Sequence, residues 1–281
     1  MSHAEETRST GKPSKSPATA PGRFAGKVAL ITGSSDRGIG AAIAERLMEE
    51  GAAVALASRT QPKKLLKRLS RHEHGAVWNS CDVTKTDDVR RSVDQCMENY
   101  GQIDVLINNA GLEVAKPFES FGEDEWRHLL EVNLSGAIRM TQAAIPYLTT
   151  PEGAIVNVSS ALALGGCSSF SMYSASKAGL LGWTQSLAWE LAPRGVRVVA
   201  VAPALVHTPM IHKHIEHLTE KAKKQIQASH PLGVGMPHDV AAAVAFLASH
   251  EARWITGVTL PLGWASSFPL PVEHFMGPTG P

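Results

Sequence analysis

The segment KVALITGSSDRGIGAAIAERLMEEG, residues 27–51, joins a strand pattern, a glycine-rich loop and a helix pattern. Its first part, KVALIT (27–32), is short and continuously apolar, which is typical of a strand buried on both faces. In residues 40–51 the apolar side chains recur at helical spacing, and the pattern stops at Gly51, a common helix terminator. The segment therefore predicts a strand, a tight turn and a helix in immediate succession.

Strand and helix patterns continue to alternate after this segment. Because parallel strands in such an alternation are joined by right-handed helical crossovers, the sequence predicts an α/β fold of the Rossmann type, with a doubly wound parallel sheet in a single domain. In these sheets ligands bind at the carboxyl ends of the strands, beside the point where the strand order reverses. The further strands are predicted at residues 53–58, 76–82, 103–110, 153–160, 196–203 and 257–260.

One domain, residues 23–265, is predicted between two tails. With 43% hydrophobic residues the 281-residue chain can form one sizeable core, and α/β folds often extend to about 250 residues as one domain. Residues 1–22 are predicted to be disordered, because they carry too little apolar surface to offset the entropy of ordering. A cleaved organelle presequence is the alternative, which Glu5 and Glu6 disfavour. Residues 266–281 form a Pro-rich C-terminal tail.

Charge and cysteine content restrict the partners and the compartment. The formal net charge of +1 gives no electrostatic reason to expect binding to nucleic acid or to an anionic membrane. There is no run of 18 apolar residues, so no membrane span is predicted. The N-terminus lacks the apolar core of a secretory signal, and Cys81, Cys96 and Cys167 are widely spaced, without a C-x-x-C pair. The sequence therefore predicts a cytoplasmic protein with reduced, mostly buried thiols.

The loop between the first strand and the first helix predicts a nucleotide site. Glycines let the main chain turn sharply and approach a pyrophosphate, and a helix N-terminus offers free N–H groups to it. A plain tight turn is the alternative, which the position of the loop at the start of an alternating fold disfavours. The predicted contacts of the loop are Gly33, Ser35, Arg37, Gly38, Ile39 and Gly40.

The end of the second strand bears on the type of cofactor. An NAD-binding sheet usually carries an acidic residue there for the ribose, whereas this chain has Ser58 and Arg59. An arginine can bind a 2′-phosphate that a carboxylate would repel, and Arg37 of the loop can reach the same region. These residues favour NADP(H) over NAD(H). A solvated loop arginine is the alternative interpretation of Arg59.

A reactive set is predicted in residues 160–177. Tyr173 and Lys177 are four residues apart at the start of a helix pattern, so their side chains share a face. A lysine ammonium beside a phenol is expected to lower the tyrosine pKa, and such a tyrosine can exchange a proton with a carbonyl or alcohol oxygen. Ser160, at the end of a predicted strand, can hold the same oxygen by a hydrogen bond.

With these motifs the chain resembles the short-chain dehydrogenase/reductase family in its single-domain form. The similarity extends from about residue 27 to about residue 262 and depends on the glycine loop, NNAG (108–111), VNL (132–134) and the reactive set. It implies hydride transfer between the nicotinamide and a carbonyl or alcohol carbon of a small molecule. The resemblance also implies an oligomer, either a homodimer or a homotetramer.

The resemblance implies a role for each matching residue. Tyr173 is expected to be the general acid/base, Ser160 to orient the substrate oxygen, and Lys177 to lower the tyrosine pKa and bind the nicotinamide ribose. Asn133 is expected to hold the water of a proton relay. The remaining expected cofactor contacts are Asp82, Val83, Asn109, Ala110 and Gly111 on the adenosine side, and Pro203, Val206 and Thr208 over the nicotinamide.

The chain departs from the family pattern at several positions. Four residues, 34–37, separate Gly33 from Gly38 where the family usually has three, and Asp36 is predicted to be the additional residue. Because a phosphate would repel its carboxylate, Asp36 is expected to face solvent or to pair with a nearby arginine. Other departures are Val199 for asparagine, Ala204 for glycine, and GWA at residues 263–265 for DGG.

Two further features have open interpretations. Residues 207–217 contain four histidines, for which a polar lid helix over the substrate is favoured over a metal site. Trp183 and Trp189 follow the reactive set at helical spacing and suit either a subunit interface or the core. The family habit of pairing through this helix favours the interface.

The predicted function is NADPH-dependent, reversible reduction of a ketone or another carbonyl to an alcohol. Residues 230–260 resemble the closing segment of family reductases that act on 3-oxoacyl groups, ketones and related carbonyls. An NAD-dependent alcohol dehydrogenase is the first alternative. A non-enzymatic nucleotide-sensing scaffold is the second, disfavoured because such proteins commonly lose the reactive Tyr or Lys that this chain retains.

Overall fold

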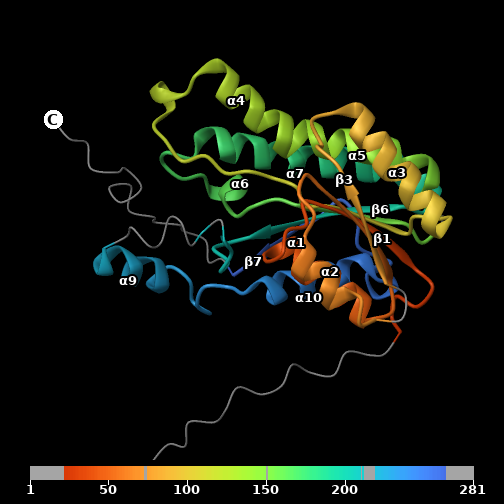
Figure 1. Ribbon diagram of the computed structural model, residues 1–281. Coiled ribbons are helices and arrows are strands. Elements are labelled where there is room, and N and C mark those ends of the chain that lie inside the picture. The colour runs from red at the N-terminus through yellow and green to blue at the C-terminus, as the bar shows by residue number, and fades with distance from the viewer. Residues whose placement is uncertain (1–21, 73–74, 150, 210, 212–218, 264–281) are drawn as a thin grey trace, which may run out of the picture.

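The computed structural model describes residues 22–72, 75–149, 151–209, 211 and 219–263. Over these residues strands and helices alternate, and seven parallel strands form one sheet in the order β3-β2-β1-β4-β5-β6-β7 (Figure 1). The predicted fold class, a doubly wound parallel sheet of the Rossmann type, is confirmed. The tails predicted at residues 1–22 and 266–281 fall almost entirely outside the described residues.

All seven predicted strands are present in the sheet. The apolar runs form its interior strands, and the last strand begins two residues later than the sequence pattern suggests. The strands are β1 (Val28–Thr32), β2 (Ala53–Ser58), β3 (Ala76–Ser80), β4 (Val105–Asn108), β5 (Ala154–Val158), β6 (Arg197–Pro203) and β7 (Thr259–Leu262).

Helices cover both faces of the sheet, with α1, α2 and α10 on one face and α3, α5 and α7 on the other (Figure 1). This arrangement is the layering expected when right-handed crossovers join parallel strands. The helices are α1 (Ile39–Glu49), α2 (Lys63–Leu69), α3 (Thr86–Tyr100), α4 (Glu123–Leu130), α5 (Gly136–Ala144), α6 (Leu162–Gly165), α7 (Ser171–Leu191), α9 (Glu220–Ala228) and α10 (Pro237–Ala248).

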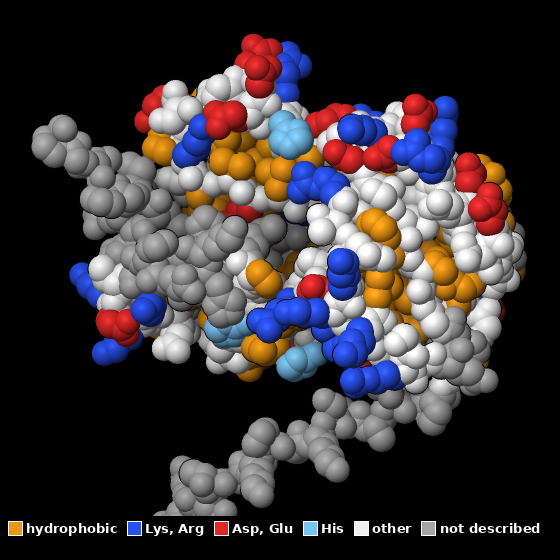
Figure 2. Space-filling model, viewed as in Figure 1, with side chains coloured by type: hydrophobic (Ala, Val, Ile, Leu, Met, Phe, Trp, Pro, Cys, Tyr) orange, Lys and Arg blue, Asp and Glu red, His pale blue; other side chains and the backbone are white. Residues whose placement is uncertain are grey.

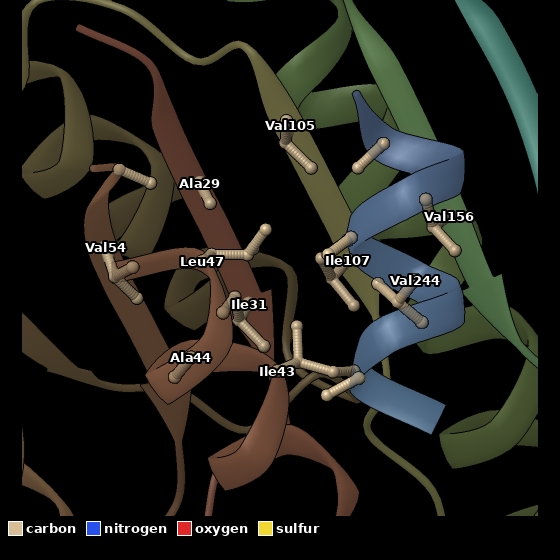
Figure 3. Close-up of a cluster of buried hydrophobic side chains, with 14 of the residues drawn as sticks. Ala29, Ile31, Ile43, Ala44, Leu47, Val54, Val105, Ile107, Val156 and Val244 are labelled. Carbon is tan, nitrogen blue, oxygen red and sulfur yellow. The ribbon is translucent and has the colours of Figure 1, made fainter. Parts of the chain in front are cut away.

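Two cores result from the alternation of strand side chains between the faces of the sheet. On one face, Ile31 and Ile107 pack against Leu47 of α1 and Val244 of α10 (Figure 3). On the other, Leu30 contacts a cluster built with α3, α5 and α7. Each buried aliphatic side chain of this size contributes about 1.5–3 kcal/mol relative to an exposed one. These cores hold the carboxyl ends of β1, β4 and β5 at one edge.

A buried polar network fixes two helices on the second face. Asn108 of β4 donates through Nδ2 to Asn157 Oδ1 at 2.9 Å and to Thr141 Oγ1 at 3.0 Å. Asn157 of β5 in turn donates to Thr184 Oγ1 at 2.8 Å. Because buried amides are costly unless they are hydrogen-bonded, this network restricts how α5 and α7 sit on the sheet.

Three sequence features outside the site can now be placed. Trp183 packs against the second core, whereas Trp189 on the same helix is 84% exposed, so the core interpretation holds for Trp183 alone. Of the histidine segment, residues 212–217 lie outside the described part of the chain. No helix among the described residues is long and apolar enough to cross a membrane.

Candidate active site

A cleft of about 600 Å³ opens at the carboxyl ends of β1, β2 and β4. It lies where the strand order reverses, because β1 is hydrogen-bonded to β2 on one side and to β4 on the other. Its volume is in the range of small-molecule sites. Lys and Arg side chains gather over α2 beside it, since the sequence of this helix is KKLLKRL (Figure 2). Such a basic rim attracts phosphate groups.

The glycines of the loop are required by close main-chain packing. Gly33 has a φ of +74°, and a Cβ at this position would lie 2.5 Å from Ala110 Cα. A Cβ on Gly40 would lie 2.6 Å from Asn109 Nδ2. Gly38 has a φ of +112°, a conformation that side-chain-bearing residues rarely adopt. The loop therefore brings bare main chain to the cleft.

The NNAG motif supports the loop from the neighbouring strand. Asn109 donates through Nδ2 to the carbonyl oxygens of Thr32 and Gly33, both at 3.0 Å. The Thr32 hydroxyl oxygen accepts the main-chain N–H groups of Asn109 and Ala110, also at 3.0 Å. The end of β1 and the end of β4 are thus joined into one rigid floor.

The residues of the cleft fit a dinucleotide. Ser34 in the loop is 1% exposed, and its hydroxyl has no hydrogen-bond partner among the described residues. An orphaned hydroxyl beside a glycine loop and a helix N-terminus is suited to a phosphate oxygen. Arg37 and Arg59 are both exposed and line the same cleft, where they can meet a further phosphate.

Asp36 differs from the sequence expectation of solvent exposure or an ion pair with arginine. Its carboxylate accepts the main-chain N–H groups of Lys64 and Leu65, at 2.8 and 3.0 Å, in the first turn of α2. Arg68 binds Asp36 as well, but through the main-chain oxygen, at 2.9 Å. Asp36 therefore connects the loop to a helix.

Asp82 and Val83 follow β3 and line the cleft as predicted. Asp82 Oδ1 accepts hydrogen bonds from the N–H and the hydroxyl of Thr84, at 3.0 and 2.8 Å. Burial opposes ionisation of this carboxyl, but the two bonds from Thr84 and the charges of Arg59 and Lys85 together lower its pKa. Asp82 thus presents a fixed carboxylate at the edge of the cleft.

Tyr173, Lys177 and Ser160 are brought together by α7 and the end of β5. The Lys177 ammonium lies 5.9 Å from the centre of the Tyr173 ring and donates to the carbonyl oxygen of Val158 at 3.0 Å. Ser160 is close enough to Tyr173 to lower its pKa by a hydrogen bond. Ser159 fixes the helix by donating to the Lys177 carbonyl at 2.8 Å. The three predicted reactive residues therefore form one site.

Asn133 is held in a π-helical turn, Glu131–Ser135, between α4 and α5. Its Oδ1 accepts the N–H of Leu112 at 2.8 Å, and its Nδ2 donates to the Leu112 carbonyl at 2.9 Å and to the Ser176 hydroxyl at 3.0 Å. Such turns often occur at functional sites because they redirect one side chain out of the helical register. Here the turn connects the NNAG strand end to α7.

The pKa of Tyr173 is raised, contrary to the sequence expectation. Burial of the phenol is the main cause, the charge of Glu113 adds to it, and the bond from Ser160 opposes it. Burial also lowers the pKa of Lys177 to about 8, against the favourable charge of Glu113. The pKa differs from the expectation because burial of the phenol and the charge of Glu113 outweigh the hydrogen bond from Ser160.

Glu113 is a site residue that the sequence interpretation missed. It follows Gly111 and Leu112 at the carboxyl end of β4, and its charge interacts with both Lys177 and Tyr173. Burial raises the pKa of Glu113 to about 7, while Lys177 opposes the shift. A carboxylate in the segment that follows a strand of this sheet was a usable signal for it.

The predicted site residues divide by their position relative to the cleft. Ser160 and Asn133 are buried next to it, at 9% and 1% exposure. Pro203 ends β6, where its carbonyl accepts the N–H of Ala161, and Val206 is buried in the first core; neither is among the lining residues of the cleft. The predicted residues that line it are Gly33, Ser35, Arg37, Gly38, Ile39, Gly40, Ser58, Arg59, Asp82, Val83, Asn109, Ala110, Gly111, Tyr173, Lys177 and Thr208.

Comparison with known proteins identifies the family of the chain. A family model described as enoyl-(acyl carrier protein) reductase matches residues 33–262. The 3-oxoacyl-(acyl-carrier-protein) reductase FabG of Thermotoga maritima is 39% identical over 241 residues, which are 84% of this chain and 95% of that protein. The 3beta-hydroxysteroid dehydrogenase 1 of Eggerthella lenta is 36% identical over 242 residues, 84% of this chain and 91% of that protein.

Among solved structures, a short chain dehydrogenase from Burkholderia cenocepacia in complex with NADP has a TM-score of 0.78 and 36% identity, covering 85% of this chain and 97% of that one. A dehydrogenase/reductase from Sinorhizobium meliloti has a TM-score of 0.80 and 32% identity, covering 86% and 96%. The fold is thus shared with proteins that are matched over nearly their whole length. The chain belongs to the short-chain dehydrogenase/reductase family of oxidoreductases, which use a nicotinamide cofactor.

Proposed function

We propose that this protein is an NADPH-dependent carbonyl reductase that converts a ketone or a related carbonyl into an alcohol. The observation that carries the proposal is the arrangement of two sets of residues along one cleft. Tyr173 and Lys177 stand at one part of it, and Arg37 and Arg59 line it as well. The first pair suits proton transfer to an oxygen, and the second suits a phosphate.

The cofactor would be held by main-chain N–H groups and by the side chains of lysine and arginine. The N–H groups of the loop around Gly38 and the N-terminus of α1 suit the pyrophosphate, and Arg37 with Arg59 suits the 2′-phosphate. Lys177 suits the nicotinamide ribose. When bound, NADPH supplies the hydride, and the protein supplies orientation and the proton.

Proton donation is assigned to Tyr173. Because burial raises its pKa, the phenol stays protonated at neutral pH, which is the state required to give a proton to a substrate oxygen. Ser160 holds that oxygen beside the phenol. The Lys177 ammonium then stabilises the phenolate left by the transfer. A site that retains its proton at neutral pH suits the direction of carbonyl reduction.

The relatives support the substrate class. A 3-oxoacyl reductase and a 3beta-hydroxysteroid dehydrogenase, as their names state, act at a ketone or at a secondary alcohol. The structure in complex with NADP supports the choice of cofactor. The alternative is an NAD-dependent alcohol dehydrogenase with the same reactive set.

A substrate and cofactor panel tests the proposal. The purified full-length protein is incubated with linear 3-oxo thioesters, cyclic ketones and steroid ketones, each with NADPH and with NADH, and the loss of cofactor absorbance is followed. We expect turnover of at least one ketone class, with kcat/KM for NADPH at least about ten-fold above that for NADH. Preference for NADH would replace the proposal by the alternative, and no turnover of any ketone with either cofactor would favour the non-enzymatic interpretation.

A further inference from the structure

The glycine loop and α2 are joined by Asp36, across 28 residues of sequence. Helix α2 begins after Pro62, which provides no side-chain hydrogen bond to its first turn. The carboxylate of Asp36 takes that place by accepting the N–H groups of Lys64 and Leu65. Asp36 therefore acts as the N-terminal cap of a helix to which it does not belong, and aspartate is among the best capping residues.

Arg68 adds a second connection between the same elements. Its guanidinium donates to the main-chain oxygen of Asp36 at 2.9 Å and forms an ion pair with Glu45 of α1. The loop is thereby bound to α2 through both the side chain and the main chain of Asp36. Glycine loop, α1 and α2 are consequently fixed relative to one another at this end of the cleft.

The connected elements carry the two arginines of the cleft. Arg37 directly follows Asp36 in the loop, and Arg59 lies in the short connection from β2 to α2. Both arginines, together with Asp36 and Pro62, line the cleft. The position of the loop relative to the start of α2 thus determines how far apart the two guanidinium groups can lie.

The charge of the Asp36 carboxylate is compensated locally. It faces the N-terminal end of α2, where unpaired N–H groups and the helix dipole favour an anion. A carboxylate bound in this way repels a nearby phosphate less than a free one. As the third of the four residues between Gly33 and Gly38, it lies opposite the first turn of α2.

We propose that Asp36 is a positioning residue for cofactor selection, which caps α2 from the glycine loop and so holds Arg37 and Arg59 together as a clamp for the 2′-phosphate of NADPH. The inference depends on the proposed NADPH specificity. It assigns to Asp36 a function in binding that the glycines do not perform, because the glycines suit the pyrophosphate, which both cofactors contain.

Two variants distinguish the capping hydrogen bonds of Asp36 from its negative charge. Asp36→Asn keeps a side-chain oxygen that can accept both N–H groups, and Asp36→Ala removes the acceptor. Binding of NADPH and of NADH to each full-length protein is measured by isothermal titration calorimetry without substrate. We expect Asp36→Ala to weaken NADPH by about ten-fold or more, with NADH changed by less than about three-fold, and Asp36→Asn to stay within about three-fold of the unaltered protein for both cofactors.

Each contrary result overturns the proposal. Equal losses of NADPH and NADH in Asp36→Ala would mean general damage to the loop, and tighter NADPH binding would mean that the carboxylate merely repels the phosphate. Equal effects of Asn and Ala would show that the charge and not the cap matters. The unaltered protein tests the proposed function separately, because its preference for NADPH over NADH is measured without reference to Asp36. A comparison of the affinities for adenosine 2′,5′-bisphosphate and AMP measures binding of the 2′-phosphate by the two arginines alone.

Discussion

Asn133 binds the main chain of Leu112 through both groups of its side-chain amide, accepting the N–H at 2.8 Å and donating to the carbonyl at 2.9 Å. The same Nδ2 donates to the Ser176 hydroxyl on α7, one residue before Lys177. The amide thus fixes the segment after β4 against the helix that carries the reactive pair. Leu112 lies between Gly111, where a Cβ would come within 3.2 Å of Lys177 Nζ, and Glu113, whose charge interacts with Lys177.

Replacing Asn133 should therefore impair turnover more than cofactor binding. Asn133→Ala leaves the N–H and carbonyl of Leu112 without their partner, and each lost bond of this kind costs about 0.5–1.5 kcal/mol. We expect kcat to fall about 10–100-fold, with the Kd for NADPH changed by less than about three-fold. Steady-state kinetics and calorimetric titration measure the two quantities.

Asn133→Asp is the matched control for this prediction. It keeps the acceptor for the Leu112 N–H but loses the donor to the Leu112 carbonyl and to Ser176. If both variants retained the original kcat, Asn133 would have no positioning function in the site.

Glu113 makes stability depend on pH. Because burial raises its folded-state pKa to about 7, from the 4.5 of a free glutamate, the folded protein binds more protons than the unfolded chain between these values. The contribution of Glu113 to the free energy of unfolding is therefore greatest below its unfolded-state pKa, and it is lost as the pH rises through its folded-state pKa. Glu113→Gln removes the titration, so this variant should melt at a higher temperature than the unaltered protein at about pH 8 and at the same temperature at about pH 4.

Thermal unfolding at several pH values measures this difference. The raised pKa of Glu113 already includes the favourable charge of Lys177, which opposes the shift. Glu119→Gln is the control, since the Glu119 side chain is exposed on the surface, and its melting temperature should match that of the unaltered protein. A lower melting temperature for Glu113→Gln at alkaline pH would mean that Glu113 stabilises the fold as an ion.

Tyr173→Phe removes the group assigned to proton donation. The phenylalanine ring retains the shape of the tyrosine but has no proton to give, and general acid catalysis contributes about 10²–10⁴-fold to rates. We expect kcat for ketone reduction to fall by at least about 10²-fold, while the NADPH Kd stays within about three-fold. Tyr147→Phe, at a 41% exposed position away from the site, should change neither quantity.

Much of the fold and of the candidate site could be predicted because both depend on local patterns. The strand KVALIT is apolar because it is buried on both faces. Gly33 and Gly40 are required because the main chain there packs directly against Ala110 and Asn109. Motif spacing likewise placed Tyr173 and Lys177 on one face of α7.

The features that could not be predicted depend on contacts between distant segments. The partner of Asp36 is the first turn of a helix 28 residues away, whose exact start no local pattern gives. The raised pKa of Tyr173 depends on burial and on Glu113, which comes from another strand end. A charge in the loop and a carboxylate after β4 were visible in the sequence, but their partners were not.

Gly40 and Gly182 allow one substitution to be tested in two environments, because both glycines are in helices. In Gly40→Ala the new Cβ would lie 2.6 Å from Asn109 Nδ2 and 3.0 Å from the Gly33 carbonyl, so the loop must move. We expect NADPH binding to weaken by at least about ten-fold and the protein to lose about 1–3 kcal/mol of unfolding free energy.

In Gly182→Ala the Cβ has no neighbour within 4 Å among the described residues, so the higher helix propensity of alanine should stabilise the protein by about 0.5–1 kcal/mol with cofactor binding unchanged. Denaturant unfolding and NADPH titration of both variants measure the contrast. Unimpaired binding in Gly40→Ala would show that the glycine loop does not approach the cofactor as closely as proposed, since a methyl group at that position would then be accommodated without displacing it.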